Sequence, residues 1–254
     1  MRNGLVFTGF LTASLLHAAG AFAVEIQVFS AGAVQEAEKA LAADFRRATG
    51  NRITFTVGTV GQIQEKLNSG APADVIVVST PALQQLEKAG DVRTQASAVL
   101  GRIGIGVGVK EGAQVPDIST PEKFKEAVLK AKSLTYMDPA VGASSGIATA
   151  KIMKNLGIDE DVAKKTVLTQ SGYSADRVAS GEVELAIQNV SEIVPVKGVR
   201  LAGPLPAALQ VYTSYAAGVA TQSTNPKESM DFIRFLTRPE AAARWKEAGV
   251  EPAH

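Results

Sequence analysis

Serine, threonine and glycine residues gather in three short stretches of the sequence, at 30–33, 58–61 and 142–146. These residue types can bind an anion, because hydroxyl groups donate hydrogen bonds and glycine lets backbone N–H groups approach a ligand closely. The third stretch, Gly-Ala-Ser-Ser-Gly, precedes a predicted helix at 148–156, and the first N–H groups of a helix have no partner inside it. Together the three stretches predict a site for a small anion.

The predicted ligand-binding residues come from these stretches, from the end of an apolar strand at 184–188 and from a glycine-spaced strand at 102–109. They are Ser30, Gly32, Thr59, Gly61, Arg102, Ser144, Ser145, Gly146, Gln188 and Asn189, with Tyr173 or Arg177 as further candidates. A plainer interpretation stays open for several of them. Ser30 and Thr59 can serve as simple helix caps, and Arg102 can pair with an acid such as Glu111.

The sequence lacks the side chains for several common kinds of active site. It contains no cysteine, so it has neither a disulfide framework nor a thiol nucleophile. Its histidines are His17, in a predicted leader, and His254, the last residue, which excludes Ser-His-Asp chemistry and a histidine-rich zinc site. We therefore expect no metal and no cofactor, and any catalytic base must be Asp, Glu, Lys or Tyr.

Residues 1–23 have the pattern of a cleavable export signal. Arg2 supplies the positive start, residues 5–19 are apolar, and Ala21-Phe22-Ala23 matches the small-residue cleavage motif. We expect a mature chain that begins at Val24, carries no lipid anchor and resides in the periplasm. Loss of Arg2 leaves 25 acidic residues and an equal number of basic ones, and no basic block stands out, which argues against nucleic-acid binding.

Strand and helix patterns alternate along the rest of the chain. Strands are predicted at 24–29, 52–57, 74–78, 102–109, 133–136, 166–168, 184–188 and 210–220. Helices are predicted at 34–48, 62–68, 82–89, 119–131, 148–156, 175–179, 225–236 and 239–249, with 195–206 expected to be loop. This order is typical of open α/β sheets, which bind ligands at the carboxyl ends of their strands.

The glycine-spaced strand at 102–109 fits a hinge that carries the chain from one domain into a second, and the strand at 210–220 fits a return to the first. The predicted α/β fold therefore has two domains, formed by 24–104 with 200–254 and by 105–199. Each is expected to be a mostly parallel sheet flanked by helices. A ligand cleft between the two domains follows from this arrangement.

Four stretches of the sequence resemble the periplasmic molybdate-binding proteins of ABC importers. They are VFSAGA at 28–33, GAPADV at 70–75, MDP at 137–139 and TRPEAA at 237–242, of which the second is the most specific. The resemblance covers nearly all of the mature chain and implies the two-domain periplasmic-binding-protein fold (type II), which closes on its ligand by hinge motion. We expect a monomer whose partners are a small anion and, in transport, an inner-membrane ABC permease.

The residues that hold the ligand in that family differ here. The family binds molybdate with a serine in the first loop, a serine in the second and a tyrosine in the second crossing. The matching positions are Ala33, Val60 or Gly61, and Asn189. Loss of these hydroxyl groups predicts an organic di- or tricarboxylate rather than molybdate as the ligand. The sequence is similar to periplasmic aconitate isomerases to a comparable degree, so an isomerase that interconverts cis- and trans-aconitate stays open beside the solute-binding protein.

Overall fold

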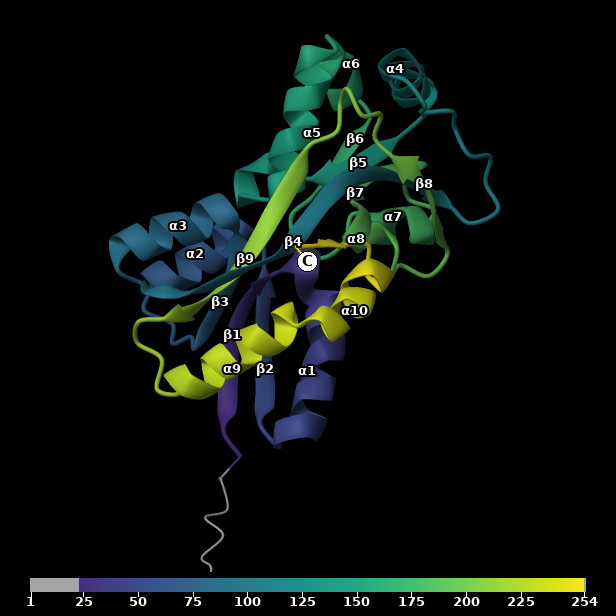
Figure 1. The fold of residues 1–254 in the computed structure, drawn as a ribbon. Coiled ribbons are helices and arrows are strands. Elements are labelled where there is room, and N and C mark those ends of the chain that lie inside the picture. The colour runs from purple at the N-terminus through teal and green to yellow at the C-terminus, as the bar shows by residue number, and fades with distance from the viewer. Residues whose placement is uncertain (1–22, 254) are drawn as a thin grey trace, which may run out of the picture.

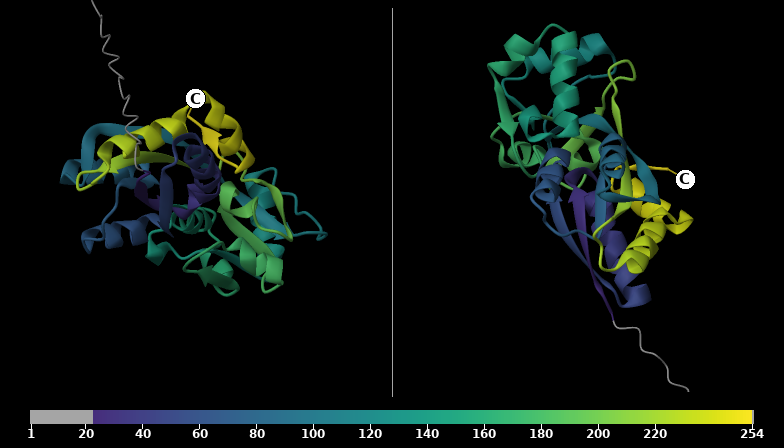
Figure 2. Two further views of the ribbon diagram at one scale, coloured as in Figure 1. Left: turned by 90° about the horizontal axis from the view of Figure 1, so that it is seen from below. Right: turned by 90° about the vertical axis from the view of Figure 1, so that its left-hand side faces the viewer.

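The computed structural model describes residues 23–253 and shows two lobes joined by long strands (Figures 1 and 2). Apart from Ala23, the predicted export signal lies outside the described residues, and so does His254. Within the described range, no helix combines the length and the apolar character that a membrane crossing requires. We call the lobe that contains the N-terminal strand the first lobe and the other the second lobe.

The first lobe is built on a sheet of strand order β2-β1-β3-β9-β4. Its strands are β1 (Glu25–Ala31), β2 (Arg52–Gly58), β3 (Val75–Ser79), β4 (Val92–Lys110) and β9 (Tyr212–Ala220), with the short β10 (Glu251–Pro252) paired to β4. β1 runs parallel to β2 and β3, whereas β9 runs antiparallel to β3 and β4. The apolar run of β3 is buried, as expected for a central strand covered on both faces.

Helices cover both faces of this first sheet (Figure 1). They are α1 (Gln35–Thr49), α2 (Val60–Asn68), α3 (Thr80–Ala89), α9 (Pro226–Thr237) and α10 (Ala242–Glu247), with short 3-10 turns η1 (Gly32–Val34) and η3 (Pro239–Ala241). Phe45 of α1, Phe232 of α9 and Trp245 of α10 share one core. Ile63 of α2 and Leu83 of α3 share another core with the opposite-facing residues of the same strands.

The second lobe is built on the far half of β4 together with β5 (Leu134–Met137), β6 (Thr166–Thr169), β7 (Leu185–Asn189) and β8 (Val199–Pro204). β5 runs parallel to β6 and β7, and β4 runs antiparallel to β7 and β8. Its helices are η2 (Pro139–Val141), α4 (Pro121–Lys130), α5 (Ser144–Asn155), α6 (Asp159–Ala163), α7 (Ala175–Ser180) and α8 (Val190–Ile193). Phe124, Ile152 and Val162 pack α4, α5 and α6 into the core of this lobe.

The chain crosses between the lobes along β4 and again just before β9. Gly104 is the last residue of β4 paired with β9, and Ile105 is the first paired with β7. At this point the side chain of Gln210 takes the place of a strand neighbour. The Ile105 N–H donates to Gln210 Oε1 at 2.8 Å, and Gln210 Nε2 donates to the Ile105 carbonyl at 2.9 Å. The hinge therefore keeps its backbone hydrogen bonds satisfied while the sheet changes partners.

The predicted α/β fold with helices flanking mostly parallel sheets is confirmed, and two local expectations need correction. α5 begins at Ser144 rather than at 148, so the Ser-Ser-Gly stretch is the first turn of the helix and not a loop before it. The stretch 195–206 contains β8, which pairs with the second-lobe half of β4. The proposed domain boundaries at 104/105 and 199/200 stay a prediction, although this pairing places 199–204 with the second lobe.

Candidate functional site

A cavity of about 110 Å³ lies between the two lobes, at the carboxyl ends of β1, β2, β5 and β7. Its lining includes Gly32 and Thr59 from the first lobe and Ser144, Ser145 and Asn189 from the second. Open α/β sheets bind their ligands at this edge, because loops and helix N-termini converge there. The cavity therefore occupies the cleft that the sequence predicts.

The start of α5 supplies hydrogen-bond donors to this cavity. Ser144 and Ser145 are the first two residues of the helix, and both line the cavity. No side chain caps the helix at Ala143, and the first hydrogen bond within the helix runs from the Ile147 N–H to the Ala143 carbonyl. The free N–H groups of this turn and the positive end of the helix dipole favour a negatively charged ligand.

Hydrogen bonds join the two lobes beside the cavity. The Thr59 hydroxyl donates to the carbonyl of Val141, and the Gly61 N–H donates to the carbonyl of Gly142 at 3.4 Å. Both contacts join the start of α2 in the first lobe to the turn before α5 in the second. These contacts hold the two lobes together at one side of the cavity, and a hinge opening of the lobes would break them.

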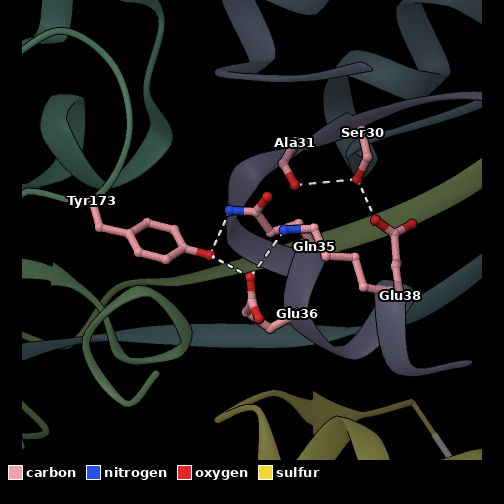
Figure 3. A network of polar contacts seen from close by, with 7 residues as sticks. Ser30, Ala31, Gln35, Glu36, Glu38 and Tyr173 are labelled. Carbon is pink, nitrogen blue, oxygen red and sulfur yellow. Dashed lines mark hydrogen bonds and ion pairs between the residues drawn. The ribbon is translucent and has the colours of Figure 1, made fainter. Parts of the chain in front are cut away.

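Tyr173, from the loop between β6 and α7, reaches across to α1 of the first lobe (Figure 3). Its hydroxyl donates to Glu36 Oε1 at 3.2 Å and accepts a hydrogen bond from Gln35 Nε2. Burial and the nearby Glu36 carboxylate raise the pKa of Tyr173, so its phenol stays protonated at neutral pH. Tyr173 and Gln35 both line the cavity and close one side of it.

Glu192, on the short helix α8, is the one charged side chain in the cavity lining among residues 23–253. The residue is only 7% exposed, and its Oε2 accepts a hydrogen bond from Asn189 Nδ2 at 2.8 Å. Burial raises the pKa of the Glu192 carboxyl to about 7, and the hydrogen bond from Asn189 offsets only part of that effect. A carboxyl group that can be neutral or charged near pH 7 therefore lines the cavity.

Tyr215 of β9 contributes a phenol to the same cavity from the first lobe. Its hydroxyl lies 2.9 Å from Ser144 Oγ, so this hydrogen bond links β9 to the start of α5. Burial, followed by the charge of Glu192, raises the pKa of Tyr215, and the phenol therefore stays protonated. The Ser144 and Tyr215 hydroxyls together can donate one hydrogen bond to each other and one to a ligand.

Part of the predicted ligand set lies together in the lining. These residues are Gly32, Thr59, Ser144, Ser145 and Asn189. Thr59 is also a helix cap, which is the plainer interpretation given above. Its Oγ1 caps α2 by accepting the N–H of Gln62 at 3.1 Å. The ligand contacts of all these residues stay predictions.

Ser30 and Gln188 lie outside the lining, because both side chains point into the protein. Ser30 is fully buried on the α1 side of β1, where its hydroxyl contacts Glu38 and the Ala31 carbonyl (Figure 3). Gln188 is also fully buried, and its Oε1 accepts the N–H of Ala175 at 3.2 Å. Each side chain therefore lies behind the residues that line the cavity and does not face the cavity itself.

Gly61 and Gly146 also lie outside the lining, and both are explained by close packing. A Cβ on Gly61 would lie 2.8 Å from the Val141 carbonyl oxygen across the cleft. A Cβ on Gly146 would lie 2.2 Å from the carbonyl oxygen of Met137, at the end of β5. Glycine at position 146 therefore lets α5 pack directly on β5. This packing, rather than the approach of a ligand to the backbone, explains why the residue is glycine.

Arg102 is remote from the cavity and pairs with an acid, although the acid is Glu251 rather than Glu111. Its Nε lies 2.7 Å from Glu251 Oε2, with the Arg102 side chain 54% exposed. The guanidinium carbon of Arg102 lies 4.3 Å from the centre of the Tyr212 ring. Because this pair is solvated, it contributes little to stability. Arg177 pairs with Glu182 and also donates from its Nε to Thr169 Oγ1 at 3.0 Å.

The sequence patterns did not point to Gln35, Glu192 and Tyr215, which also line the cavity. Glu192 stands three residues after Asn189, and its only signal was the polar pair that ends β7, followed at once by a turn of helix. Tyr215 begins the buried, apolar part of β9, which is the ordinary setting of a core aromatic residue.

A second, larger groove of about 950 Å³ lies on the second lobe beside α4 and the stretch 113–117. Its charged lining residues are Lys110, Lys123, Lys130, Lys132, Asp117, Glu126 and Glu184. Mixed charges of this kind are typical of a solvated surface, and the groove is remote from the loops at the carboxyl strand ends. We therefore place the candidate site in the cavity between the lobes.

Two α/β lobes that enclose a site at their strand ends define the class of two-domain periplasmic binding proteins. Residues 26–251 match the family model described as bacterial extracellular solute-binding protein, and the chain belongs to this family. An aconitate isomerase from a Pseudomonas species is 28% identical over 233 residues, which cover 89% of this chain and 87% of that protein.

The molybdate-binding proteins are similar over the same length. The Escherichia coli (strain K12) protein is 24% identical over 230 residues, covering 89% of this chain and 88% of that one. The structure of the periplasmic molybdate-binding protein from Azotobacter vinelandii matches with a TM-score of 0.76 at 18% identity, over 89% of this chain and 98% of that chain. At that identity the structural match shows the fold alone.

Proposed function

We propose that this protein is a periplasmic solute-binding protein of an ABC importer and that it binds a small organic di- or tricarboxylate between its lobes. The observation that carries the proposal is the cavity itself, where the uncapped start of α5 and the hydroxyls of Ser144 and Ser145 meet Thr59 and Tyr215 of the other lobe. The free N–H groups and the serine hydroxyls can donate to anionic oxygens without a cationic side chain, whereas the Thr59 hydroxyl already donates to Val141. Membership of the solute-binding family supports the transport role.

The choice of a carboxylate over molybdate rests on the apolar residues in the same lining. Ala33 and Val60 both line the cavity, and neither carries a hydroxyl group. A tetrahedral oxyanion offers four oxygens that must all be satisfied once water is excluded, and unpaired buried polar groups are costly. A carboxylate ligand presents carbon as well as oxygen, and its carbon skeleton can pack against these two side chains.

A thermal-shift screen of purified mature protein tests the proposal. The panel holds cis-aconitate, trans-aconitate, citrate and tricarballylate against molybdate, sulfate and phosphate. A ligand at a hundred times its dissociation constant stabilises the folded state by roughly 2.7 kcal/mol, which is a readily measured rise in melting temperature. Stabilisation by a carboxylate and not by molybdate supports the proposal. Stabilisation by molybdate alone, or by no anion, contradicts it.

Aconitate isomerisation is the second candidate, and two observations favour it. One is the 28% identity to the Pseudomonas aconitate isomerase. The other is Glu192, because a buried carboxyl with a pKa raised to about 7 can accept and return a proton near neutral pH. The reaction needs only one such group: a proton leaves the methylene carbon, the double bond shifts, and a proton returns to the former alkene carbon.

Proton NMR in heavy water separates the two candidates. A binding protein returns aconitate unchanged, whereas an isomerase interconverts the cis and trans forms and exchanges the mobile proton with solvent. Interconversion at ordinary enzyme rates that is lost in the Glu192→Gln variant favours the isomerase. Binding without interconversion or exchange favours the transport role.

A further inference from the structure

We propose that Glu192 is protonated when the cavity holds its anion, so that one proton is bound together with the ligand and Glu192 selects anions as a hydrogen-bond donor. The inference rests on the proposed anion binding and adds the state of the carboxyl group in the site. It starts from an apparent conflict: a cavity lined by donors for an anion also carries one acidic side chain.

The geometry gives the two oxygens of this carboxyl different surroundings. Oε2 of Glu192 is held by Asn189 Nδ2 at 2.8 Å. Oε1 lies 3.5 Å from the point where a Cβ on Gly32 would stand, so it lies against the first-lobe turn that lines the cavity. Gly32 has no side chain to cover Oε1, and the hydrogen bond from Asn189 is made to Oε2 alone. Oε1 is therefore the atom positioned to meet a ligand oxygen.

No opposite charge balances Glu192 within the described part of the chain. The elements packed against α8 are β4, β7, β8 and η1, and none of them places a lysine or arginine in the cavity lining. The titratable neighbours are Tyr215 on β9 and Tyr173 before α7, whose pKa values are raised so that both stay neutral, and Glu36, which binds the Tyr173 hydroxyl and adds a second acid rather than a counter-charge. A ligand carboxylate would therefore meet an uncompensated negative charge if Glu192 were ionised.

A proton on Glu192 turns this repulsion into a hydrogen bond to the anion, and bonds to charged acceptors are the stronger kind. Burial has already raised the pKa of the free carboxyl to about 7, and a bound anion raises it further. Above pH 7 the complex must then take up a proton that the free protein lacks. Linkage predicts an affinity that is constant at lower pH and falls by up to about tenfold per pH unit above it.

Titration calorimetry with tricarballylate tests this coupling, because this saturated tricarboxylate has no double bond and cannot be isomerised. The titrations are run with the mature protein from pH 6.5 to 9, and at pH 8 in two buffers of different ionisation enthalpy. The expected result is uptake of close to one proton per ligand at pH 8 and an affinity at least tenfold weaker at pH 9 than at pH 7.

Two variants locate the proton. Glu192→Gln keeps the shape and a donor but cannot titrate, so it should bind without proton uptake and with little change from pH 7 to pH 9. Glu38→Gln removes another buried carboxyl, one that lies on α1 outside the cavity lining, and should keep the pH dependence of the wild type. Both variants share the titration of the ligand with the wild type, so that effect cancels in the comparison.

The outcomes separate this inference from the proposed function. Binding with no proton uptake and an equal affinity at pH 7 and 9 overturns the inference and leaves the proposed function intact. Failure of tricarballylate, citrate and both aconitates to bind at any pH overturns both. If the Glu192→Gln variant does not fold, the two-buffer measurement on the wild type still decides the question.

Discussion

Gly61 and Gly142 face each other across the cleft with no room for a side chain between them. The Gly61 N–H donates to the Gly142 carbonyl at 3.4 Å. A Cβ built on Gly61 would lie 3.0 Å from Gly142 Cα, and one built on Gly142 would lie 2.7 Å from Gly61 Cα. The two lobes can therefore close to this distance only because both residues are glycine.

Replacement of Gly61 should weaken ligand binding, which brings the lobes together, without lowering the stability of the fold. Gly61 lies in the first turn of α2 and has no positive φ, so alanine fits the helix and favours it by up to about 1 kcal/mol. The same Cβ would meet the Val141 carbonyl oxygen at 2.8 Å when the lobes close. We expect Gly61→Ala to keep or raise the melting temperature of the free protein and to weaken ligand binding about tenfold or more, measured by calorimetry.

The control for this prediction is Glu65→Ala, an exposed change on the same helix that should alter neither property strongly. Small-angle scattering adds a direct readout, since the ligand should compact the wild type but not Gly61→Leu. Wild-type affinity in both Gly61 variants would show that closure to the observed distance is not required for binding.

Ser145 should contribute binding energy rather than stability. It is 2% exposed and lines the cavity, and the structure shows no side-chain hydrogen bond for its hydroxyl among the described residues. A hydrogen bond to a charged ligand is worth roughly 1.5–3 kcal/mol, so Ser145→Ala should weaken binding by about tenfold to a hundredfold. Its melting temperature should stay near that of the wild type. An unchanged affinity would remove Ser145 from the site.

Gly146→Val should instead damage the fold. The new Cβ would stand 2.2 Å from the Met137 carbonyl oxygen, which cannot move without shifting β5 or α5. Overpacking of this kind typically costs about 1–3 kcal/mol, and backbone contacts give the upper end of that range. Urea unfolding of Gly146→Val and Gly146→Ala should show lower stability in both, with the larger loss in valine. Stability equal to that of the wild type would contradict the packing of α5 on β5.

Glu38 should make the protein less stable as the pH rises. The side chain is fully buried beside Ser30, and burial raises its pKa from 4.5 to about 8. Between these two values the folded state holds a proton that the unfolded state has lost, so stability is greatest at low pH and falls as the pH approaches 8. Glu192 acts in the same direction up to about pH 7. The quantity to measure is therefore the difference in the free energy of unfolding between the wild type and Glu38→Gln, in which the contribution of Glu192 cancels.

As the pH increases from 5 to 8, the wild type should lose stability relative to the Glu38→Gln variant. Denaturant unfolding at four pH values measures it, and Glu65→Gln, an exposed carboxyl on α2, serves as the matched control. A difference that is independent of pH would mean that Glu38 is ionised in the folded protein, with a partner other than Ser30.

Much of the fold could be predicted because local patterns and tertiary environment agree. The continuous apolar run of β3 indicated a strand buried on both faces, and it is one. The Ser-Ser-Gly stretch between a strand and a helix pointed to the edge where the cavity lies, and Ser144 and Ser145 line it. The sequence predicts a start of α5 that is four residues too late, at 148 instead of Ser144, because serine and glycine at a helix start resemble loop residues locally.

The rest of the site depends on how the two lobes meet, which no local pattern encodes. Tyr215 and Ser144 lie far apart in the sequence and on different lobes, and their hydroxyls lie 2.9 Å apart where the lobes meet. Glu192 enters the cavity because α8 begins directly after β7. The sequence makes Arg102 a candidate because it is a cation on the predicted hinge strand, but its side chain faces Glu251 at the surface.

Calorimetric titration of the mature wild-type protein with tricarboxylates and with molybdate tests the central claim most directly. We predict that at least one of citrate, tricarballylate, cis-aconitate and trans-aconitate binds with a micromolar or lower Kd near pH 7, and that molybdate produces no saturable heat. Tight binding of molybdate, or the absence of binding by every carboxylate, would contradict the assignment of the cavity as a carboxylate site.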